Sequence, residues 1–255
     1  MTIYNLYSFF FYRLYLIFIG FILYFICDFI YYLIILPKYK IGNIPLKKTP
    51  FIIKLFTTAP RLLAQAVIDR TSDEFKEHGL YIFCGEQGSG KTMSMTYNIN
   101  RLFFKYPNCK ILTNYGLMIQ DLPLNSSDDL LKYNNGMSGI IFGIDEIQAT
   151  FNSRNWKNFP PDLLACICQN RKSHRVIYST AQSVSQVDKA IRLQTRRYIM
   201  NYTFFDFITV SLWYKPFFDF DGNLEKSKLR KIQIFFQEES LRYQYNTFDL
   251  IKSLR

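Results

Sequence analysis

The pattern of apolar and polar positions divides the chain into three regions. From Leu14 to Leu36 almost every residue is apolar, and Asp28 is the only charged one. A helix over this stretch would be about 34 Å long, enough to cross a bilayer. From about residue 78 to about residue 200, short apolar β-prone runs alternate with helix-prone runs. After Ile191 the runs become aromatic and typical of strands.

The alternating region predicts an α/β fold with a mostly parallel sheet flanked by helices. The predicted strands are Leu80–Cys84, Lys110–Thr113, Gly139–Ile144 and Arg175–Thr180, and the predicted helices are Lys91–Phe104 and one from Pro160-Pro161 to about Asn170. Beyond Ile191, the runs Tyr198–Trp213 and Lys231–Phe236 flank a turn at Asp221-Gly222. This spacing predicts a hairpin or a small sheet, a β-rich C-terminal region.

Flanking charges predict how the apolar N-terminal stretch crosses a membrane. Only Arg13 and the chain amine precede it, whereas a basic group follows: Lys38, Lys40, Lys47, Lys48, Lys54 and Arg61. The positive-inside rule therefore predicts a single-pass protein of the host cell membrane, with the N-terminus outside and the rest in the cytoplasm. A cleaved signal peptide fits poorly, because the stretch is too long and no small-x-small site follows. Asp28 either lies near a helix end or pairs with a polar group of a neighbouring copy.

Net charge and cysteine content add little to this picture. A formal charge of +11 and a pI near 9.3 fit contact with nucleic acid or with anionic lipid, without choosing between them. The five cysteines form no metal-ligand pattern. A linker at Ile41–Pro50 precedes the helix-prone Phe51–Phe75, which would lie on the membrane surface or cover one side of the sheet.

A glycine-rich motif joins the first predicted strand to the first predicted helix. The residues Gly85, Glu86, Gln87, Gly88, Ser89, Gly90, Lys91 and Thr92 satisfy the pattern G-x-x-x-x-G-K-[ST]. In such a loop several backbone N–H groups point at one phosphate, and the helix N-terminus adds partial positive charge. Lys91 would then reach the β- and γ-phosphates and Thr92 would ligate Mg²⁺. The motif predicts binding of ATP and Mg²⁺; the alternative is a glycine-rich turn that matches by chance.

Two acids follow the strand that ends at Ile144. Asp145 is placed to coordinate Mg²⁺, directly or through water. Glu146 is placed to orient or deprotonate the attacking water. Together with the upstream loop they predict a hydrolytic phosphoryl-transfer site, a P-loop NTPase. The alternative is a strand that ends in two solvated acids.

A third polar group, Gln182, follows the Arg175–Thr180 strand. Its amide would sense the γ-phosphate or position water, unless it merely caps the strand. Five arginines are candidates for a finger acting in trans, with Arg192 preferred: Arg171, Arg175, Arg192, Arg196 and Arg197. Such a finger requires an oligomer. The predicted division is a membrane anchor at 1–40, a linker and juxtamembrane helix at 41–77, an ATPase core at 78–200 and a β-rich extension at 201–255.

Over about residues 80–200 the chain resembles the zonular occludens toxin (Zot) family, which includes membrane-bound assembly ATPases of filamentous phages within the FtsK–HerA group of DNA-pumping motors. The segments that carry the resemblance are Ile144–Gln148, Phe151–Arg154, Thr113–Leu117, Arg171, Thr180–Gln182, Val187-Asp188 and Ile191-Arg192. Members of that family commonly carry their membrane span after the ATPase domain, whereas here the predicted span comes first. That departure puts in doubt any export channel built from the family's C-terminal part.

The resemblance implies a membrane-anchored, Mg²⁺-dependent ATPase that powers assembly and extrusion of filamentous virions. It also implies a homo-oligomeric ring, a hexamer, with phage coat proteins, single-stranded phage DNA or both as partners. A DNA translocase or coupling ATPase for packaging or plasmid transfer is the alternative. A structural membrane protein with a vestigial nucleotide site and a toxin are two further interpretations.

Overall fold

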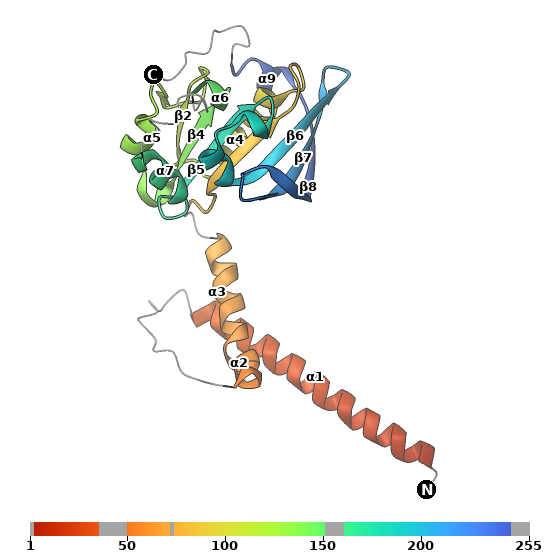
Figure 1. The fold of residues 1–255 in the computed structure, drawn as a ribbon. Coiled ribbons are helices and arrows are strands. Elements are labelled where there is room, and N and C mark those ends of the chain that lie inside the picture. The colour runs from red at the N-terminus through yellow and green to blue at the C-terminus, as the bar shows by residue number, and fades with distance from the viewer. Residues whose placement is uncertain (1–2, 36–49, 72–73, 151–160, 246–255) are drawn as a thin grey trace. The chain divides into compact units, whose positions relative to one another are not determined.

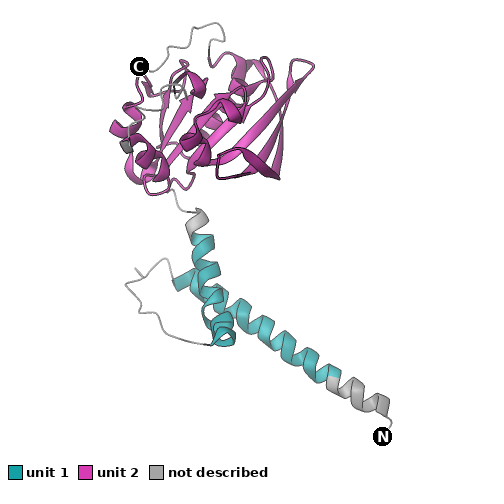
Figure 2. Ribbon diagram, viewed as in Figure 1, with its two compact units in different colours: residues 1–72 teal, residues 73–255 magenta. Residues whose placement is uncertain are grey.

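The computed structural model describes residues 3–35, 50–71, 74–150 and 161–245. The chain forms two compact units, residues 1–72 and residues 73–255 (Figure 2). The basic residues of the 36–49 segment, the linker from Ile41 and the family-like Phe151–Arg154 lie outside the described residues.

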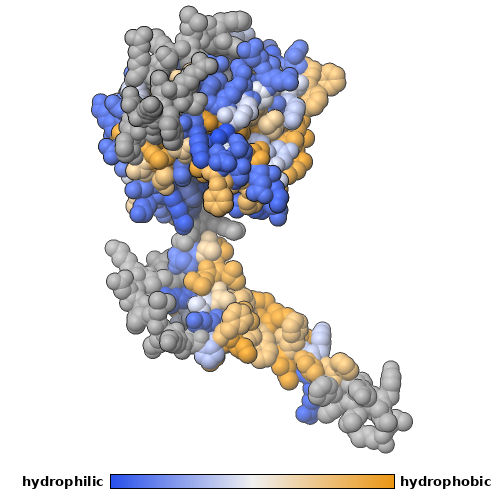
Figure 3. All heavy atoms as spheres, in the orientation of Figure 1, coloured by the Kyte–Doolittle hydropathy of each residue, from blue (hydrophilic) through white to orange (hydrophobic). Residues whose placement is uncertain are grey.

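The first unit is built around one long apolar helix, α1 (Ile3–Ile35). Its segment Phe11–Ile35 is long and apolar enough to cross a membrane, and none of its most apolar window is buried. Apolar side chains cover this helix in the space-filling view (Figure 3). Asp28 lies within α1 and is half-buried. The predicted long apolar helix is therefore present.

Two shorter helices, α2 (Phe51–Thr57) and α3 (Ala59–Thr71), accompany α1. They are bent by 43° relative to each other, and the ring of Phe56 on α2 stacks on that of Phe21 on α1 at 4.9 Å. The apolar side chains of Phe51, Ile52 and Leu62 are exposed. The predicted helix therefore forms as two helices and ends at Thr71.

The second unit contains one eight-stranded sheet in the order β3-β2-β4-β5-β1-β6-β7-β8 (Figure 1). The strands are β1 (Gly79–Cys84), β2 (Lys110–Thr113), β3 (Leu122–Pro123), β4 (Ile140–Ile144), β5 (Arg175–Ala181), β6 (Thr195–Phe204), β7 (Ile208–Phe218) and β8 (Leu224–Phe236). Pairing is parallel from β3 to β6 and antiparallel between β6, β7 and β8. The predicted mostly parallel sheet is confirmed.

Helices cover both faces of the parallel strands. They are α4 (Lys91–Lys105), α5 (Asp129–Lys132), α6 (Ile147–Thr150), α7 (Pro161–Cys168), α8 (Lys189–Leu193) and α9 (Glu239–Arg242), with short 3₁₀ turns at Gly136–Ser138 and Val184–Gln186. On β1, Ile82 belongs to the core cluster shared with α7 and α8, and Phe83 to the cluster shared with α4. Because both faces are buried, β1 and β4 carry no charged or hydroxyl side chain apart from Tyr81, whereas β5 also buries Arg175, Ser179 and Thr180.

The C-terminal strands confirm the predicted hairpin, because β7 and β8 pair antiparallel on either side of Asp221-Gly222. They form no separate sheet, because β6 pairs in parallel with β1 and extends the central sheet. The run Tyr198–Trp213 is also not one strand, because it turns at Phe205-Asp206, where φ is 52° and 59°. Two-residue turns with positive φ normally carry Asn or Gly, and this turn carries neither. Asp206 is the only typical turn residue there, so the sequence pattern did not predict this turn.

Candidate active site

The phosphate loop lies between the end of β1 and the start of α4, as predicted. Gly90 is the N-cap of α4 and has φ of 82°. A Cβ atom on Gly90 would lie 2.6 Å from the hydroxyl oxygen of Thr203, so both the backbone and the space require glycine. At Gly85, with φ of 148°, a Cβ atom would lie 2.4 Å from the hydroxyl of Ser89. The loop is thus closely packed against β6 and against itself.

The side chain of Lys91 lies along this loop. Its Nζ donates hydrogen bonds to the backbone oxygens of Gly85, at 3.1 Å, and Glu86, at 2.8 Å. Both acceptors are neutral carbonyls, so the ammonium charge has no carboxylate among these hydrogen-bond partners. This charge is available to an anion that binds against the N-terminus of α4.

The carboxylate of Asp145, which follows β4, lies within hydrogen-bonding distance of the hydroxyl of Thr92 in the first turn of α4. The Thr92 hydroxyl donates to Oδ1 at 3.0 Å, and the Thr180 hydroxyl donates to the same oxygen. Burial raises the pKa of Asp145 above its ordinary value, while the hydrogen bonds from Thr180 and Thr92 and the charge of Lys91 act in the opposite direction. The structure therefore joins the two predicted metal ligands.

The backbone of Asp145 is held by a residue whose function the sequence did not reveal. The Asp145 N–H donates to Oδ1 of Asn114 at 2.7 Å, and Nδ2 of Asn114 donates to the Asp145 carbonyl at 3.0 Å. Asn114 directly follows β2, which pairs with β4. The signal that could have identified Asn114 is its polar amide immediately after a buried strand. Only the folded sheet shows that its partner is the Asp145 backbone.

Glu146 has a left-handed backbone conformation, with φ of 53°. Its N–H donates to the hydroxyl of Thr180 at 2.8 Å, and its side chain is exposed. Positive φ is uncommon outside glycine and costs about 1–3 kcal/mol. The turn thus leaves the Glu146 side chain exposed directly after Asp145, and its role as a general base stays a prediction.

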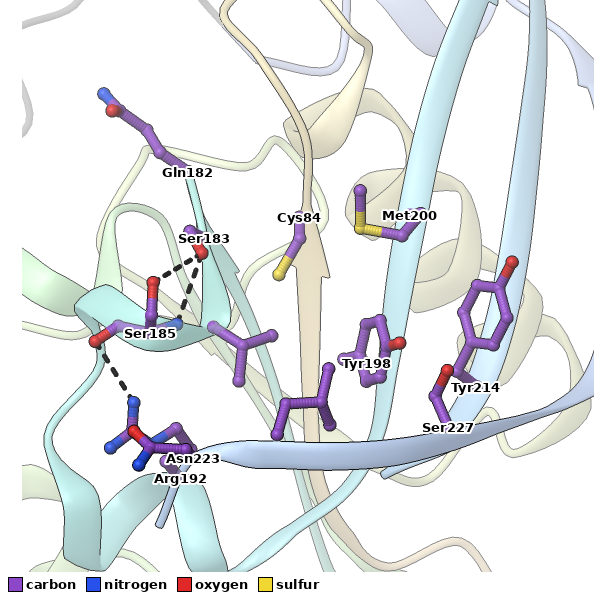
Figure 4. Close-up of a pocket in the computed structure, with 12 residues that line it drawn as sticks. Cys84, Gln182, Ser183, Ser185, Arg192, Tyr198, Met200, Tyr214, Asn223 and Ser227 are labelled. Atoms are coloured by element: carbon purple, nitrogen blue, oxygen red, sulfur yellow. Dashed lines mark hydrogen bonds between the residues drawn. The ribbon is translucent and has the colours of Figure 1, made fainter. Parts of the chain in front are cut away.

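Gln182 follows β5, which lies between β1 and β4 in the sheet. Its carbonyl accepts a hydrogen bond from the Gly85 N–H at 3.4 Å. Its side chain is exposed and extends away from Cys84 (Figure 4). The structure therefore places the main chain of Gln182 against the phosphate loop; the sensing role of its amide stays a prediction.

Arg192 lines a pocket of about 470 Å³ together with Gln182 and Cys84 (Figure 4). The Arg192 guanidinium donates to the Ser185 carbonyl at 3.2 Å. Lys91 and Thr92 do not line this pocket. Burial raises the pKa of the Cys84 thiol to about 12, so this cysteine stays protonated. Arg192 as a finger in trans stays a prediction.

The other arginine candidates lie in different surroundings. Arg175 is buried and donates to the carbonyl of Tyr133 at 3.2 Å and to the sulfur of Cys166. Arg196 donates to the carbonyl of His78 at 2.6 Å. Arg171 is exposed. None of these residues is among those that line the pocket at the phosphate loop.

The C-terminal strands support the phosphate loop through residues that sequence reasoning missed. The Thr203 hydroxyl on β6 donates to the Ser89 carbonyl at 3.0 Å. Nε2 of Gln237, after β8, donates to the hydroxyl of Thr209 at 2.8 Å and to that of Thr203 at 3.3 Å. These contacts join positions more than a hundred residues from the loop, so no local pattern identifies them.

The donor set at Thr92 and Asp145 fits Mg²⁺. A hydroxyl and a carboxylate are the hard oxygen ligands that this ion prefers, and they lie within 3.0 Å of each other. Among the described residues, no group of three or more His, Cys, Asp or Glu side chains forms another metal-binding cluster. A phosphate loop between a strand and a helix, with an acid after a parallel strand of the same sheet, is the arrangement that characterises P-loop nucleotide-binding sites.

Similar architectures occur among solved structures. The N-terminal domain of zonular occludens toxin from Neisseria meningitidis matches with a TM-score of 0.46 and 18% identity, over 66% of this chain and 98% of that one. The genome packaging NTPase B204 of Sulfolobus turreted icosahedral virus 2, solved with ATP-gammaS, matches with 0.42 and 12%, over 63% and 98%. The ATPase DotB of Legionella pneumophila matches with 0.33 and 13%, over 70% and 50%. No protein-family model and no curated protein sequence matches the chain.

Proposed function

We propose that this chain is a membrane-anchored, Mg²⁺-dependent ATPase. The observation that carries the proposal is the hydrogen-bonded group of Thr92, Asp145 and Thr180 beside the phosphate loop, with the ammonium of Lys91 along that loop. A solvated pair of acids would need no such contacts. The apolar helix α1 supports anchoring in the host cell membrane as a single span with the N-terminus outside.

Each residue has a separate task in the proposed hydrolysis. The loop N–H groups and Lys91 bind the phosphates and stabilise the charge that develops during transfer to water. Glu146, exposed at the turn after β4, accepts the proton of the attacking water. Thr92 and Asp145 would hold Mg²⁺, which when bound neutralises charge on the β- and γ-phosphates. Asn114 and Thr180 fix the backbone that positions both acids.

Measurement of phosphate release by the full chain in detergent tests this proposal. We expect Mg²⁺-dependent hydrolysis of ATP, and a fall of about 100- to 1000-fold in Asp145→Asn. Asp162→Asn is the matched control, because Asp162 is an exposed acid in the first turn of α7. Equal activity in wild type and Asp145→Asn, or no hydrolysis by any oligomer of the wild type, would contradict it.

The work that the ATPase performs is proposed to be assembly and extrusion of filamentous virions through the host membrane, by a homo-oligomeric ring, a hexamer by family resemblance. The residues that resemble the Zot family, Thr180–Gln182 and Ile191-Arg192 among them, support this assignment. The cargo would be single-stranded phage DNA, coat protein or both. Complementation with Lys91→Ala tests it: released virions should disappear while intracellular phage DNA persists. Normal release by that variant would overturn the assignment.

A cluster of basic side chains favours DNA movement as a second candidate function. Burial and the neighbouring Arg196 and Arg230 lower the pKa of Arg197, and burial and Arg101 lower the pKa of Lys231. Burial is the largest cause of both shifts and the neighbouring cations add to it, and a group of basic side chains is the kind of surface that a polyanion such as DNA contacts. DNA-stimulated hydrolysis that Lys231→Ala abolishes would support a translocase. Hydrolysis that DNA leaves unchanged would count against it.

A further inference from the structure

The phosphate loop opens into a pocket that the C-terminal part of the chain completes. This pocket has a volume of about 370 Å³. From the loop and the start of α4 it is lined by Gly88, Gly90, Lys91, Thr92 and Met93, and from the C-terminal part by Thr203, Asp206, Gln237, Arg242 and Tyr245. Binding sites for small molecules begin at about 300 Å³, so the space suits one nucleotide moiety.

The residues around the phosphate loop indicate where the γ-phosphate end and the nucleoside end of a bound nucleotide would lie. The γ-phosphate end must lie where Thr92 meets Asp145, because the metal ligands are there. No residue of β4 or β5 lines the 370 Å³ pocket. The nucleoside end has to leave the loop on another side, and this pocket adjoins the loop on the side of β6 and α9.

Arg242 is an exposed charged side chain of this pocket that is held by two hydrogen bonds. Its Nε donates to the carbonyl of Gln237 at 3.1 Å, and its Nη2 donates to the carbonyl of Asp206. Both acceptors are backbone groups, so the guanidinium plane is oriented and its charge is not neutralised by them. A planar guanidinium held in this way stacks well on an aromatic ring.

The short helix that carries Arg242 is itself held against the loop helix. Leu241 is buried with Met93 of α4 and Phe235 of β8. The backbone of Gln244 accepts from the Met118 N–H at 2.8 Å, and its side chain accepts from Nδ2 of Asn100. Arg242 therefore belongs to a fixed element and not to a freely moving arm.

We propose that the pocket between the phosphate loop, β6 and α9 binds the nucleoside of ATP, with the guanidinium of Arg242 stacked on the base. The proposal rests on the proposed ATPase function and adds to it the residue that recognises the nucleoside. Arg242 was not among the arginines that the sequence singled out.

Competition binding with a fluorescent ATP analogue tests the assignment on the full chain in detergent. Arg242→Ala should weaken ATP and ADP by the same factor, about tenfold, and change binding of inorganic tripolyphosphate less than about twofold. Arg242→Lys keeps the positive charge but removes the planar guanidinium that stacks on the base. This variant should therefore lose nearly as much affinity for ATP and ADP as Arg242→Ala. Lys228→Ala is the control, because Lys228 is an exposed cation on β8 outside the pocket.

Each other outcome has a distinct meaning. Unchanged ATP and ADP affinity in Arg242→Ala would overturn the proposal, as would a loss for ATP alone, which would place Arg242 at the γ-phosphate. An equal loss for tripolyphosphate would also overturn it, because Arg242 would then act on the phosphates. If the wild type binds neither ATP nor ADP, both the proposed ATPase function and this assignment fail; if it binds both nucleotides but hydrolyses no ATP, the ATPase function fails and this assignment stands.

Discussion

The parallel and the antiparallel halves of the sheet contribute differently to the same site. The parallel strands are covered on both faces, and the polar residues predicted to act on the metal and the γ-phosphate follow them, Asp145 after β4 and Gln182 after β5. The antiparallel strands are covered by α4 on one face, while Ile232, Ile234 and Phe236 remain more than half exposed on β8. Their hydroxyl and amide groups support the phosphate loop from the side.

This difference separates two requirements of a nucleotide site. Charged groups at the reacting end must be held rigidly, and strands buried on both faces provide that rigidity. The phosphate loop must close around an anion. The uncharged Thr203 hydroxyl donates to the loop, and Gln237 donates to Thr203, so neither contact adds a charge that competes with the anion. We therefore expect substitutions in the parallel half to be more damaging than matched ones in the antiparallel half.

The largest expected effect is on stability. Phe83, on β1, is fully buried and its ring lies 5.6 Å from that of Tyr178 and 5.9 Å from that of Trp213. Phe83→Ala should lower the free energy of unfolding by about 3–5 kcal/mol. Ile234→Ala, at a position 63% exposed on β8, should change it by less than about 0.5 kcal/mol. Urea denaturation followed by tryptophan fluorescence measures both, and equal losses would remove the distinction between the halves.

The second effect compares two threonines at the site. Thr180→Val removes a donor to the Asp145 carboxylate and the acceptor of the Glu146 N–H, so ATP turnover should fall about 10- to 100-fold. Thr203→Val removes a bond to the neutral Ser89 carbonyl, so ATP affinity should fall about fivefold. Serine at either position should restore most of the loss. A larger loss at Thr203 than at Thr180 would reverse the comparison.

The smallest expected effect is a dependence of the free energy of unfolding on pH, through Asp145 in the parallel half. Burial raises the pKa of Asp145 above its ordinary value of 3.8, so the folded chain binds this proton more tightly than the unfolded chain. The contribution of Asp145 to stability is then full in acid and is lost as pH rises through the raised pKa. Wild type should lose stability relative to Asp145→Asn over that interval, as thermal unfolding at a series of pH values would measure. A difference between the two proteins that is constant from about pH 4 to about pH 8 would contradict this.

Much of the parallel half could be predicted, because its signals are local. The run from Leu80 to Cys84 is apolar, the loop motif follows it, and Asp145 comes directly after the next long apolar strand. Parallel strands have their carboxyl ends at one edge, so groups that follow them meet there. The contact of Thr92 with Asp145 follows from that rule.

The antiparallel half was predicted less well, for two physical reasons. The turn at Phe205-Asp206 has positive φ at both residues and Asp206 as its only typical turn residue, so the sequence pattern did not predict that the chain reverses there. The pairing of β6 with β1 joins segments more than a hundred residues apart, and no periodicity encodes such a partner. The predicted hairpin forms from β7 and β8, but with β6 it extends the central sheet.

By itself, the sequence determined the phosphate loop, the acids after β4, the long apolar helix and the α/β class. Each of these depends on neighbouring residues or on the regular spacing of apolar residues within one element. Only the tertiary structure decided that Asn114 and Thr180 hold Asp145 and Glu146, that Thr203 and Gln237 support the loop, and that Arg242 lines the pocket beside it. Those contacts depend on strand order and on the packing of α9 against α4, and long-range packing leaves no pattern along the chain.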